Sequence, residues 1–232
     1  MVAIKGLEKF SSKDFPGRIS STVFLGGCNF RCPFCHNADL VLRPESYDTL
    51  SMDFFLSYLD SRKGWLDGIC ITGGEPLLED DLETLARVVK ERGLLVKLDT
   101  NGSLPDRLEA VCGAGVVDCV AMDIKAPLER YREVTRSCVE PENIQRSVEF
   151  LMKSGLEYVF RTTVVPGLVG GDDIARISGW LDGAKAYQIQ QFVPHDTIDP
   201  AYLELRPFTG EDLNDFAGIA RPHFDEVRIE GA

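Results

Sequence analysis

The sequence has no apolar run near the roughly 20 residues that a membrane-spanning helix needs. Its first residues have neither the basic start nor the apolar stretch of a secretory signal. It also lacks a surplus of basic residues, since 25 Lys and Arg stand against 37 Asp and Glu and leave a net charge of −12. Repulsion from phosphate groups disfavours nucleic acid as a partner. We therefore expect a cytoplasmic protein without a membrane or nucleic-acid partner.

The chain has no internal repeat, low-complexity tract or linker rich in proline and serine. With 44% hydrophobic residues it can bury a continuous core, so we expect one domain over residues 1–232. Apolar segments rich in β-branched residues alternate with segments of helical periodicity. The predicted strands cover residues 19–25, 68–72, 94–98, 116–122, 157–164, 186–191 and 226–229. The predicted helices cover residues 51–62, 80–91, 105–112, 142–153, 172–181 and 210–220.

This alternation of strands and helices is typical of right-handed βαβ units and a parallel sheet. The spacing of the elements leaves two architectures open, a doubly wound sheet and a sheet bent toward a (β/α) barrel. In both, the carboxyl ends of the strands hold the reactive groups, because loops there can vary without disturbing the core.

Three of the seven cysteines lie within eight residues, in the segment G-G-C-N-F-R-C-P-F-C-H-N at residues 26–37. An odd number of cysteines and this spacing do not suit the disulfide framework of a small secreted domain. Thiolates at C-x3-C-x2-C spacing can instead hold three irons of a [4Fe–4S] cluster and leave the fourth iron open to a substrate. We therefore predict that Cys28, Cys32 and Cys35 are metal ligands and catalytic residues.

Two other interpretations of this loop stay open. One is a closed zinc site in which His36 joins the three cysteines, although adjacent Cys35 and His36 would chelate one ion awkwardly. The other is ordinary core cysteines, which a glycine-flanked loop matches poorly. The remaining thiols lack a second cluster spacing and are interpreted as packed or semi-exposed: Cys70, Cys112, Cys119 and Cys138.

Polar motifs also follow the predicted strands. Residues 68–76 read G-I-C-I-T-G-G-E-P, which is either a simple strand-to-helix turn or a loop whose glycines let a ligand approach the backbone. Asp99 and Asp123 each come at a strand end, as a solvated carboxylate or as part of a site for a cation or ammonium group. Arg161 interrupts an apolar strand and should be paired if it faces the interior.

The spacing C-x3-C-x-aromatic-C, with Phe34 as the aromatic residue, resembles the signature of the radical S-adenosylmethionine (SAM) superfamily. The following His36-Asn37 resembles the activases of glycyl radical enzymes. The segment D-F-P-G at residues 14–17 is similar to the anaerobic ribonucleoside-triphosphate reductase activating protein branch. Later motifs are similar to the pyruvate formate-lyase activating enzyme, so the resemblance covers residues 6–196. It implies a partial (β/α)6 TIM-like barrel with parallel strands, a [4Fe–4S] cluster and SAM.

In this family the G-G-E-P loop pairs its backbone with the methionyl amino group of SAM. The D-T-N-G and D-x-K segments bind SAM and a monovalent cation, so the resemblance assigns that cation to Asp99, Thr100 and Asp123, with the carbonyl of Ala121 in place of the family's methionine. It also places Arg161 near the SAM carboxylate and His195 against the adenosine. The implied cofactor-binding residues are Phe34, His36, Asn37, Gly73, Gly74, Glu75, Asp99, Thr100, Asp123, Lys125, Arg161 and His195.

The activity that the resemblance implies is reductive cleavage of SAM to methionine and a 5′-deoxyadenosyl radical, with an electron from flavodoxin or ferredoxin. The radical would take a hydrogen atom from a backbone glycine of a partner, such as anaerobic ribonucleotide reductase. One alternative is a radical SAM enzyme that modifies a small molecule or nucleic acid. Another is a zinc or iron–sulfur scaffold that binds a partner without catalysis.

Overall fold

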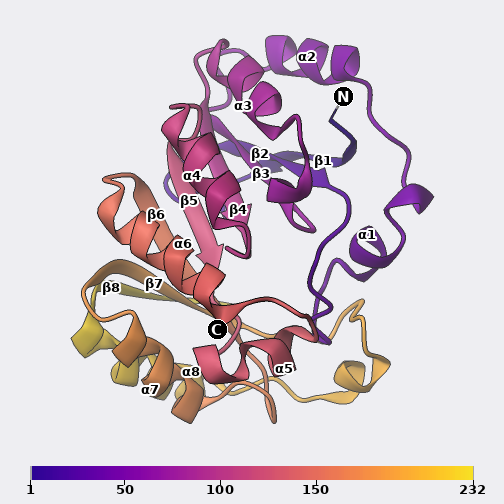
Figure 1. Cartoon of the computed structure of the whole chain (residues 1–232). Helices are drawn as coiled ribbons and strands as arrows, with labels where there is room; N and C mark the ends of the chain where they lie inside the picture. The colour runs from indigo at the N-terminus through magenta and orange to yellow at the C-terminus, as the bar shows by residue number, and fades with distance from the viewer. Residues whose placement is uncertain (1, 232) are drawn as a thin grey trace. The chain divides into compact units, whose positions relative to one another are not determined.

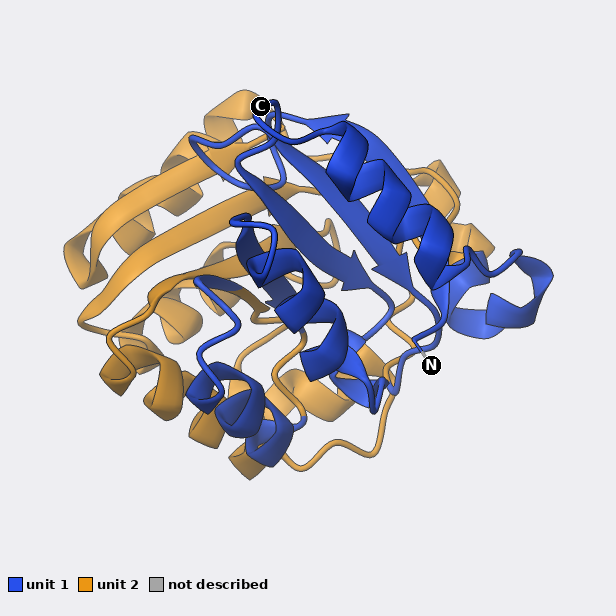
Figure 2. Cartoon of the chain, turned by 90° about the horizontal axis from the view of Figure 1, so that it is seen from above, with its two compact units in different colours: residues 1–29, 39–100, 104–120 blue, residues 30–38, 101–103, 121–232 orange. Residues whose placement is uncertain are grey.

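The computed structural model describes residues 2–231 (Figure 1) and consists of two compact units, which Figure 2 shows in blue and orange. The first contains residues up to 29 together with 39–100 and 104–120. The second contains residues 30–38 and 101–103 and the chain from 121 onward. The single domain expected from the sequence stays a prediction.

The first unit is built on four neighbouring strands. β1 (Ile4–Ser11) is antiparallel to β2 (Ser20–Leu25), whereas β2, β3 (Gly68–Gly73) and β4 (Leu95–Thr100) are parallel to one another. The last three match predicted strands to within two residues at each end. β1 was not predicted, because charged residues and a glycine interrupt its apolar residues, and three of its eight residues are exposed, as is usual for a strand with one unpaired edge.

Amphipathic helices join the parallel strands of this unit. α2 (Met52–Ser61) begins where the Ser51 hydroxyl accepts the Phe54 N–H, the cap that the sequence indicates. α3 (Leu82–Lys90) buries an apolar stripe and packs beside β4. The unit also includes α4 (Pro105–Gly113), the 3-10 turns η1 (Pro44–Ser46) and η2 (Pro76–Leu78), and most of α1 (Ala38–Leu42).

The second unit contains three parallel strands, β6 (Glu157–Val164), β7 (Ala184–Gln191) and β8 (Phe224–Glu230). β6 has the bounds that its sequence predicts. β7 begins two residues earlier than predicted and β8 extends beyond the predicted strand at both ends. β5 (Cys119–Asp123) begins in the first unit and ends in the second.

The helices of the second unit are α5 (Tyr131–Thr135), α6 (Pro141–Lys153), α7 (Gly171–Trp180) and α8 (Gly210–Ala220), with 3-10 turns η3 (Leu128–Arg130), η4 (Pro200–Glu204) and η5 (Arg221–His223). α7 packs on α8, and α8 packs on β7 and β8. The three long helices were predicted. α5 was missed, because five residues are too few to display a helical period.

The fold class is the α/β class that the sequence predicts, with parallel strands linked by helices. One detail corrects the expectation that the D-T-N-G segment follows a strand: Asp99 and Thr100 are the last two residues of β4 itself, and Asp123 is the last residue of β5. Backbone pairing therefore continues past the apolar part of the strand into its polar tip. Within residues 2–231, no helix is long and apolar enough to cross a membrane.

Candidate active site

The cysteine loop, residues 26–37, connects β2 to α1 without a helix or strand of its own. Cys28 belongs to the first unit, whereas Cys32 and Cys35 belong to the second. The Cys35 N–H donates to the Cys32 carbonyl oxygen at 3.1 Å, so a tight turn joins these two cysteines. All three thiols are outside disulfides, and Phe34 between the last two is buried.

Among residues 2–231, no three His, Cys, Asp or Glu side chains form a group that could hold a metal ion. Ligation by Cys28, Cys32 and Cys35 therefore stays a prediction. A set of three thiols in one loop suits an iron–sulfur cluster by its donor chemistry, because soft sulfur ligands select such clusters.

The stretch after β7 is tied to the cysteine loop within the second unit. His36 Nε2 lies 2.7 Å from the Val193 carbonyl oxygen, and the His36 ring stacks on Phe192 with 5.9 Å between centroids. The Asp199 N–H donates to the Pro33 carbonyl oxygen at 3.0 Å. These contacts give His36 a structural role that the sequence did not indicate.

His195 lies in the same stretch with 75% of its side chain exposed, and its Nδ1 is 3.0 Å from the Asp196 carboxylate. Asn37 contributes a backbone hydrogen bond to the Cys35 thiol. The predicted contacts of His195 with adenosine and of Asn37 with the cofactor stay predictions.

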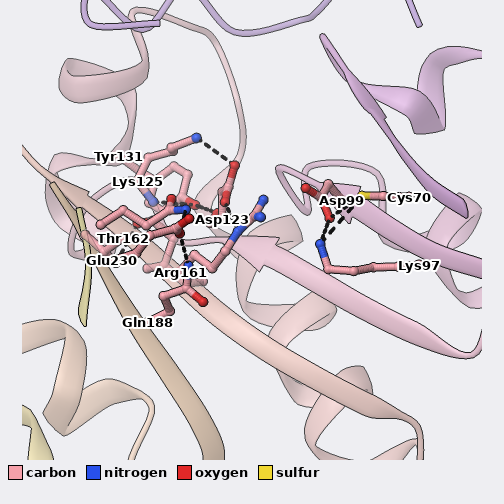
Figure 3. Close-up of polar contacts among 12 residues, drawn as sticks. Cys70, Lys97, Asp99, Asp123, Lys125, Tyr131, Arg161, Thr162, Gln188 and Glu230 are labelled. Carbon is pink, nitrogen blue, oxygen red and sulfur yellow. Dashed lines mark hydrogen bonds and ion pairs between the residues drawn. The ribbon is translucent and has the colours of Figure 1, made fainter. Parts of the chain in front are cut away.

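A charge cluster lies where β5 ends and in β6 (Figure 3). It consists of Asp123, the last residue of β5, Lys125, two residues later, and Arg161 in β6. Lys125 Nζ is 2.9 Å from Asp123 Oδ2, and Arg161 Nε is 2.9 Å from Asp123 Oδ1. Burial by itself raises the pKa of the Asp123 carboxyl, and the cations of Arg161 and Lys125 outweigh it and lower the pKa to about 2. Arg161 is thus paired, as predicted for a charge that faces the interior, and this half-buried cluster is not the solvated pair of the simpler interpretation.

Lys125 also lies within the electrostatic reach of the cysteine loop. Burial alone lowers the pKa of its ammonium group, but negative charge on Asp123, Cys32 and Cys35 outweighs burial, and the pKa is raised. For Cys35, burial is the largest effect and raises the pKa of the thiol, with Lys125 among the opposing influences. The Lys125 cation therefore lies within electrostatic range of two of the three sulfur donors, and it opposes the rise in the pKa of the Cys35 thiol.

In the first unit, the two glycines of the G-G-E-P loop are required by close backbone packing. Gly73 has φ +127°, and a Cβ there would lie 2.1 Å from the Leu25 carbonyl oxygen. A Cβ on Gly74 would lie 1.8 Å from the Gly27 carbonyl oxygen. The N–H groups of Gly74 and Glu75 donate to these same oxygens at 2.9 and 2.8 Å. Since an ammonium group donates hydrogen bonds, it would have to be bound here by carbonyl oxygens of the loop.

The Glu75 side chain is buried, with 1% of the residue exposed. Its Oε1 accepts the Thr100 hydroxyl at 2.7 Å and the Leu77 N–H at 3.1 Å. Glu75 therefore caps η2 and links the G-G-E-P loop to the end of β4. The sequence placed Glu75 and Thr100 in the same site but not in contact with each other.

Sequence reasoning missed Lys97, which is 2% exposed inside β4. Its ammonium forms an ion pair with Asp99 and lies 3.7 Å from the Cys70 sulfur, which is 3.6 Å from Asp99 Oδ1 (Figure 3). Cys70 and Lys97 are cross-strand partners of β3 and β4. The signal was present in the sequence, because residues two apart in a strand share a face and a buried lysine needs a carboxylate.

Each carboxylate proposed for a monovalent cation thus has a cationic partner from the chain itself, Lys97 for Asp99 and Lys125 with Arg161 for Asp123. Ala121, whose carbonyl was expected to complete that site, is fully buried in β5. The cation stays a prediction.

Comparison with known proteins identifies the family. The sequence pattern described as the radical SAM superfamily matches residues 22–176. A Methanocaldococcus jannaschii protein named as a candidate glycyl-radical enzyme activating enzyme is 32% identical over 97% of this chain and 95% of its own length. The pyruvate formate-lyase-activating enzyme of Streptococcus mutans is 30% identical over 84% of this chain and 78% of its own. A Halobacterium salinarum protein named as a candidate GTP 3′,8-cyclase is 32% identical, but only 45% of its length is covered.

A solved domain of pyruvate-formate lyase-activating enzyme from Bacteroides vulgatus has the same fold. It superposes with a TM-score of 0.56 at 15% identity and covers 71% of this chain and 99% of that domain. This likeness agrees with the partial TIM-like barrel that the sequence resemblance implies. The family pattern covers more than half of the 232 residues and includes the cysteine loop, the G-G-E-P loop and the Asp123 cluster. The chain therefore belongs to the radical SAM superfamily and is an enzyme of that family.

Proposed function

We propose that this radical SAM enzyme generates a glycyl radical on a partner enzyme and that the partner is anaerobic ribonucleotide reductase. Of the relatives reported above, the one from Methanocaldococcus jannaschii is named as a candidate glycyl-radical enzyme activating enzyme, and the one from Streptococcus mutans as a pyruvate formate-lyase-activating enzyme. The D-F-P-G segment at residues 14–17 supports the choice of partner. Flavodoxin or ferredoxin supplies the electron in this proposal.

The observation that carries the proposal is the charge cluster of Asp123, Lys125 and Arg161 next to the cysteine loop. Lys125 lies within electrostatic range of Cys32 and Cys35, so the cluster places a cation near two of the sulfur donors. A methionyl group carries a carboxylate and an ammonium, and the cations and the carboxylate of the cluster are complementary to it.

The residues have the following roles in this proposal. Cys28, Cys32 and Cys35 hold a [4Fe–4S] cluster, which when bound supplies the electron that cleaves SAM to methionine and a 5′-deoxyadenosyl radical. Arg161 and Lys125 attract the carboxylate of SAM. The carbonyl oxygens of the G-G-E-P loop accept its ammonium. Phe34 and its neighbours keep water away from the sulfur donors, since Phe34 and Cys32 are buried.

The test is anaerobic incubation of the reconstituted enzyme with SAM, reductant and purified anaerobic ribonucleotide reductase. We expect a glycine-centred doublet in the electron paramagnetic resonance (EPR) spectrum and 5′-deoxyadenosine in amounts that match it. Deuterated glycine in the partner should transfer deuterium to the 5′-deoxyadenosine. Formation of 5′-deoxyadenosine without the doublet would refute the partner, and no SAM cleavage by a fully reconstituted cluster would refute the activity.

A matched pair of variants assigns the cluster ligands. Cys32→Ser should lose iron and SAM cleavage, because serine does not replace a thiolate on iron. Cys138→Ser, at an exposed cysteine outside the loop, should keep both. Equal iron content in the two variants would contradict ligation by Cys32.

The second candidate is modification of a small molecule, favoured by the similarity to the candidate GTP 3′,8-cyclase. Incubation with GTP in place of the partner protein separates the two functions. A cyclised nucleotide would support the second candidate, and unchanged GTP would count against it.

A further inference from the structure

Tyr131 is a fully buried residue, and its hydroxyl group contacts the turn that follows β5. The hydroxyl donates to the Asp123 carbonyl oxygen and accepts the Lys125 N–H, both at 3.2 Å. Burial is the largest cause of the raised pKa of the Tyr131 phenol, so the group stays protonated and able to donate. Tyr131 thus binds the backbone of Asp123 and Lys125, two of the three residues whose side chains form the charge cluster (Figure 3).

Ile124, the residue between Asp123 and Lys125, is bonded to β6. The Ile124 N–H donates to the Arg161 carbonyl oxygen at 2.7 Å, and its own carbonyl accepts the Thr162 hydroxyl at 2.8 Å. Four successive backbone groups, from the Asp123 carbonyl to the Lys125 N–H, are therefore bonded to Tyr131 or β6. Tyr131 makes the first and the last of these four hydrogen bonds. The positions of Asp123 and Lys125 therefore depend on the position of Tyr131.

Tyr131 also contacts the cysteine loop. Its ring meets the Phe30 ring edge to face, with 6.3 Å between centroids and 71° between planes. Four residues later in the same helix, the Thr135 carbonyl accepts the Arg31 N–H at 2.9 Å, and the Thr135 hydroxyl donates to the Tyr131 carbonyl at 2.6 Å. α5 is therefore attached to the two residues that precede Cys32.

A helix of five residues is marginal on its own, so α5 is held in place by these side-chain and loop contacts. It contacts the Asp123–Lys125 turn through the Tyr131 hydroxyl, and the residues before Cys32 through the Tyr131 ring and the Thr135 carbonyl. A displacement of Tyr131 would move one relative to the other.

We propose that Tyr131 is a positioning residue that couples the Asp123–Lys125 turn to the cysteine loop and so sets the distance between the SAM-binding charges and the sulfur donors. The hydroxyl holds the turn, and the ring and α5 hold the loop. The consequence for SAM rests on the proposed function, whereas the coupling itself does not.

The test compares Tyr131→Phe with Tyr158→Phe. Tyr158 is also buried in this unit, and its hydroxyl accepts a backbone N–H, that of Lys185, at the same 3.2 Å. Both variants lose one buried phenol hydroxyl and keep the ring. Tyr131→Phe removes one donated and one accepted hydrogen bond, whereas Tyr158→Phe removes one accepted bond. A purely structural role predicts changes only at the bonded groups of each variant, and a positioning role predicts a change beyond them in Tyr131→Phe.

The first measurement is amide hydrogen exchange of the full chain without added cofactors. In Tyr131→Phe we expect exchange to rise about tenfold at Lys125 and also at Arg31, which the hydroxyl does not touch. In Tyr158→Phe the increase should be confined to Lys185 and its neighbours. Unchanged exchange at Arg31 in Tyr131→Phe would overturn the coupling, whatever the enzyme does with SAM.

The second measurement is made on the reconstituted enzyme. Tyr131→Phe should keep the wild-type iron content, but the SAM concentration that half-saturates the change in the cluster's EPR spectrum should rise about tenfold. Tyr158→Phe should match the wild type. An equal half-saturating SAM concentration in the two variants would contradict a role of Tyr131 in SAM binding. Absence of any SAM-dependent change in the wild type would instead refute the proposed function and leave the exchange result to decide the coupling.

Discussion

The Thr100 hydroxyl donates a 2.7 Å hydrogen bond to the buried carboxyl of Glu75, which joins two motifs that are 25 residues apart in the chain. Glu75 belongs to the loop after β3 and Thr100 ends β4, so the bond connects neighbouring strand ends within the first unit. It holds the G-G-E-P loop against the tip of the sheet. The carbonyl oxygens of that loop are thereby given a fixed direction.

Removal of this bond should loosen the loop. Thr100→Val keeps the shape of the side chain but leaves Glu75 without the hydroxyl donor, and we expect a loss of about 1 kcal/mol in the free energy of unfolding. Thr100→Ser retains the hydroxyl and should lose less. Denaturant titration of both variants is the measurement, and equal losses would show that the methyl group rather than the hydroxyl matters.

Close packing of the glycine pair makes a second prediction. Gly74→Ala places a Cβ 1.8 Å from a backbone oxygen, so the loop has to move, and we expect a loss of about 3 kcal/mol or more. The control is Gly179→Ala in α7, where a Cβ has nothing within 4 Å, and it should stabilise the protein by about 0.5 to 1 kcal/mol. Thermal unfolding of the two variants gives the comparison. Unchanged stability of Gly74→Ala would show that the backbone at Gly27 can move to make room for the added Cβ.

The buried pair of Lys97 and Asp99 predicts strong coupling. Either Lys97→Met or Asp99→Asn removes this ion pair and leaves one of its two charges buried, and each should cost about 3 to 5 kcal/mol. The double variant should cost less than the sum of the two, because it buries neither charge. A double-mutant cycle by denaturant unfolding measures this difference. Additive losses would contradict the pairing of the two side chains.

The charge cluster predicts how stability depends on pH. The pKa of Asp123 falls from its ordinary 3.8 to about 2, so between these values the unfolded chain binds a proton that the native chain does not. The contribution of this group, about 2 kcal/mol, is therefore complete above pH 4 and is lost as the pH falls toward 2. Asp123→Asn should lower stability at neutral pH and flatten the pH dependence in that window.

The control for this measurement is Asp225→Asn, at an exposed aspartate of β8. Urea unfolding of the cluster-free chain between pH 2 and pH 7 should give curves of the same shape for this variant and the wild type. If the free energy of unfolding of Asp123→Asn changed with pH as steeply as that of the wild type, the acid sensitivity would belong to other carboxylates.

Local patterns in the sequence determined much of this protein. The spacing of Cys28, Cys32 and Cys35 needs no tertiary structure to be recognised, because its chemistry lies within one loop. Apolar residues that recur every two residues likewise located the central strands, and those that recur every 3.6 residues located the long helices. Both patterns arise because a single element buries one of its faces. The strand and helices that were missed, β1, α1 and α5, have too little apolar periodicity to be seen in isolation.

Tertiary structure alone decided which side chains meet. The bond between Thr100 and Glu75, the pairing of Arg161 with Asp123, and the contacts of Tyr131 join residues that are distant in sequence, and strand register or a short helix brings them together. No local propensity encodes such pairs, because hydrogen bonds and ion pairs are satisfied in three dimensions. The sequence by itself therefore determined the family and the cysteine loop, and the packing of the chain determined how the residues around that loop are held.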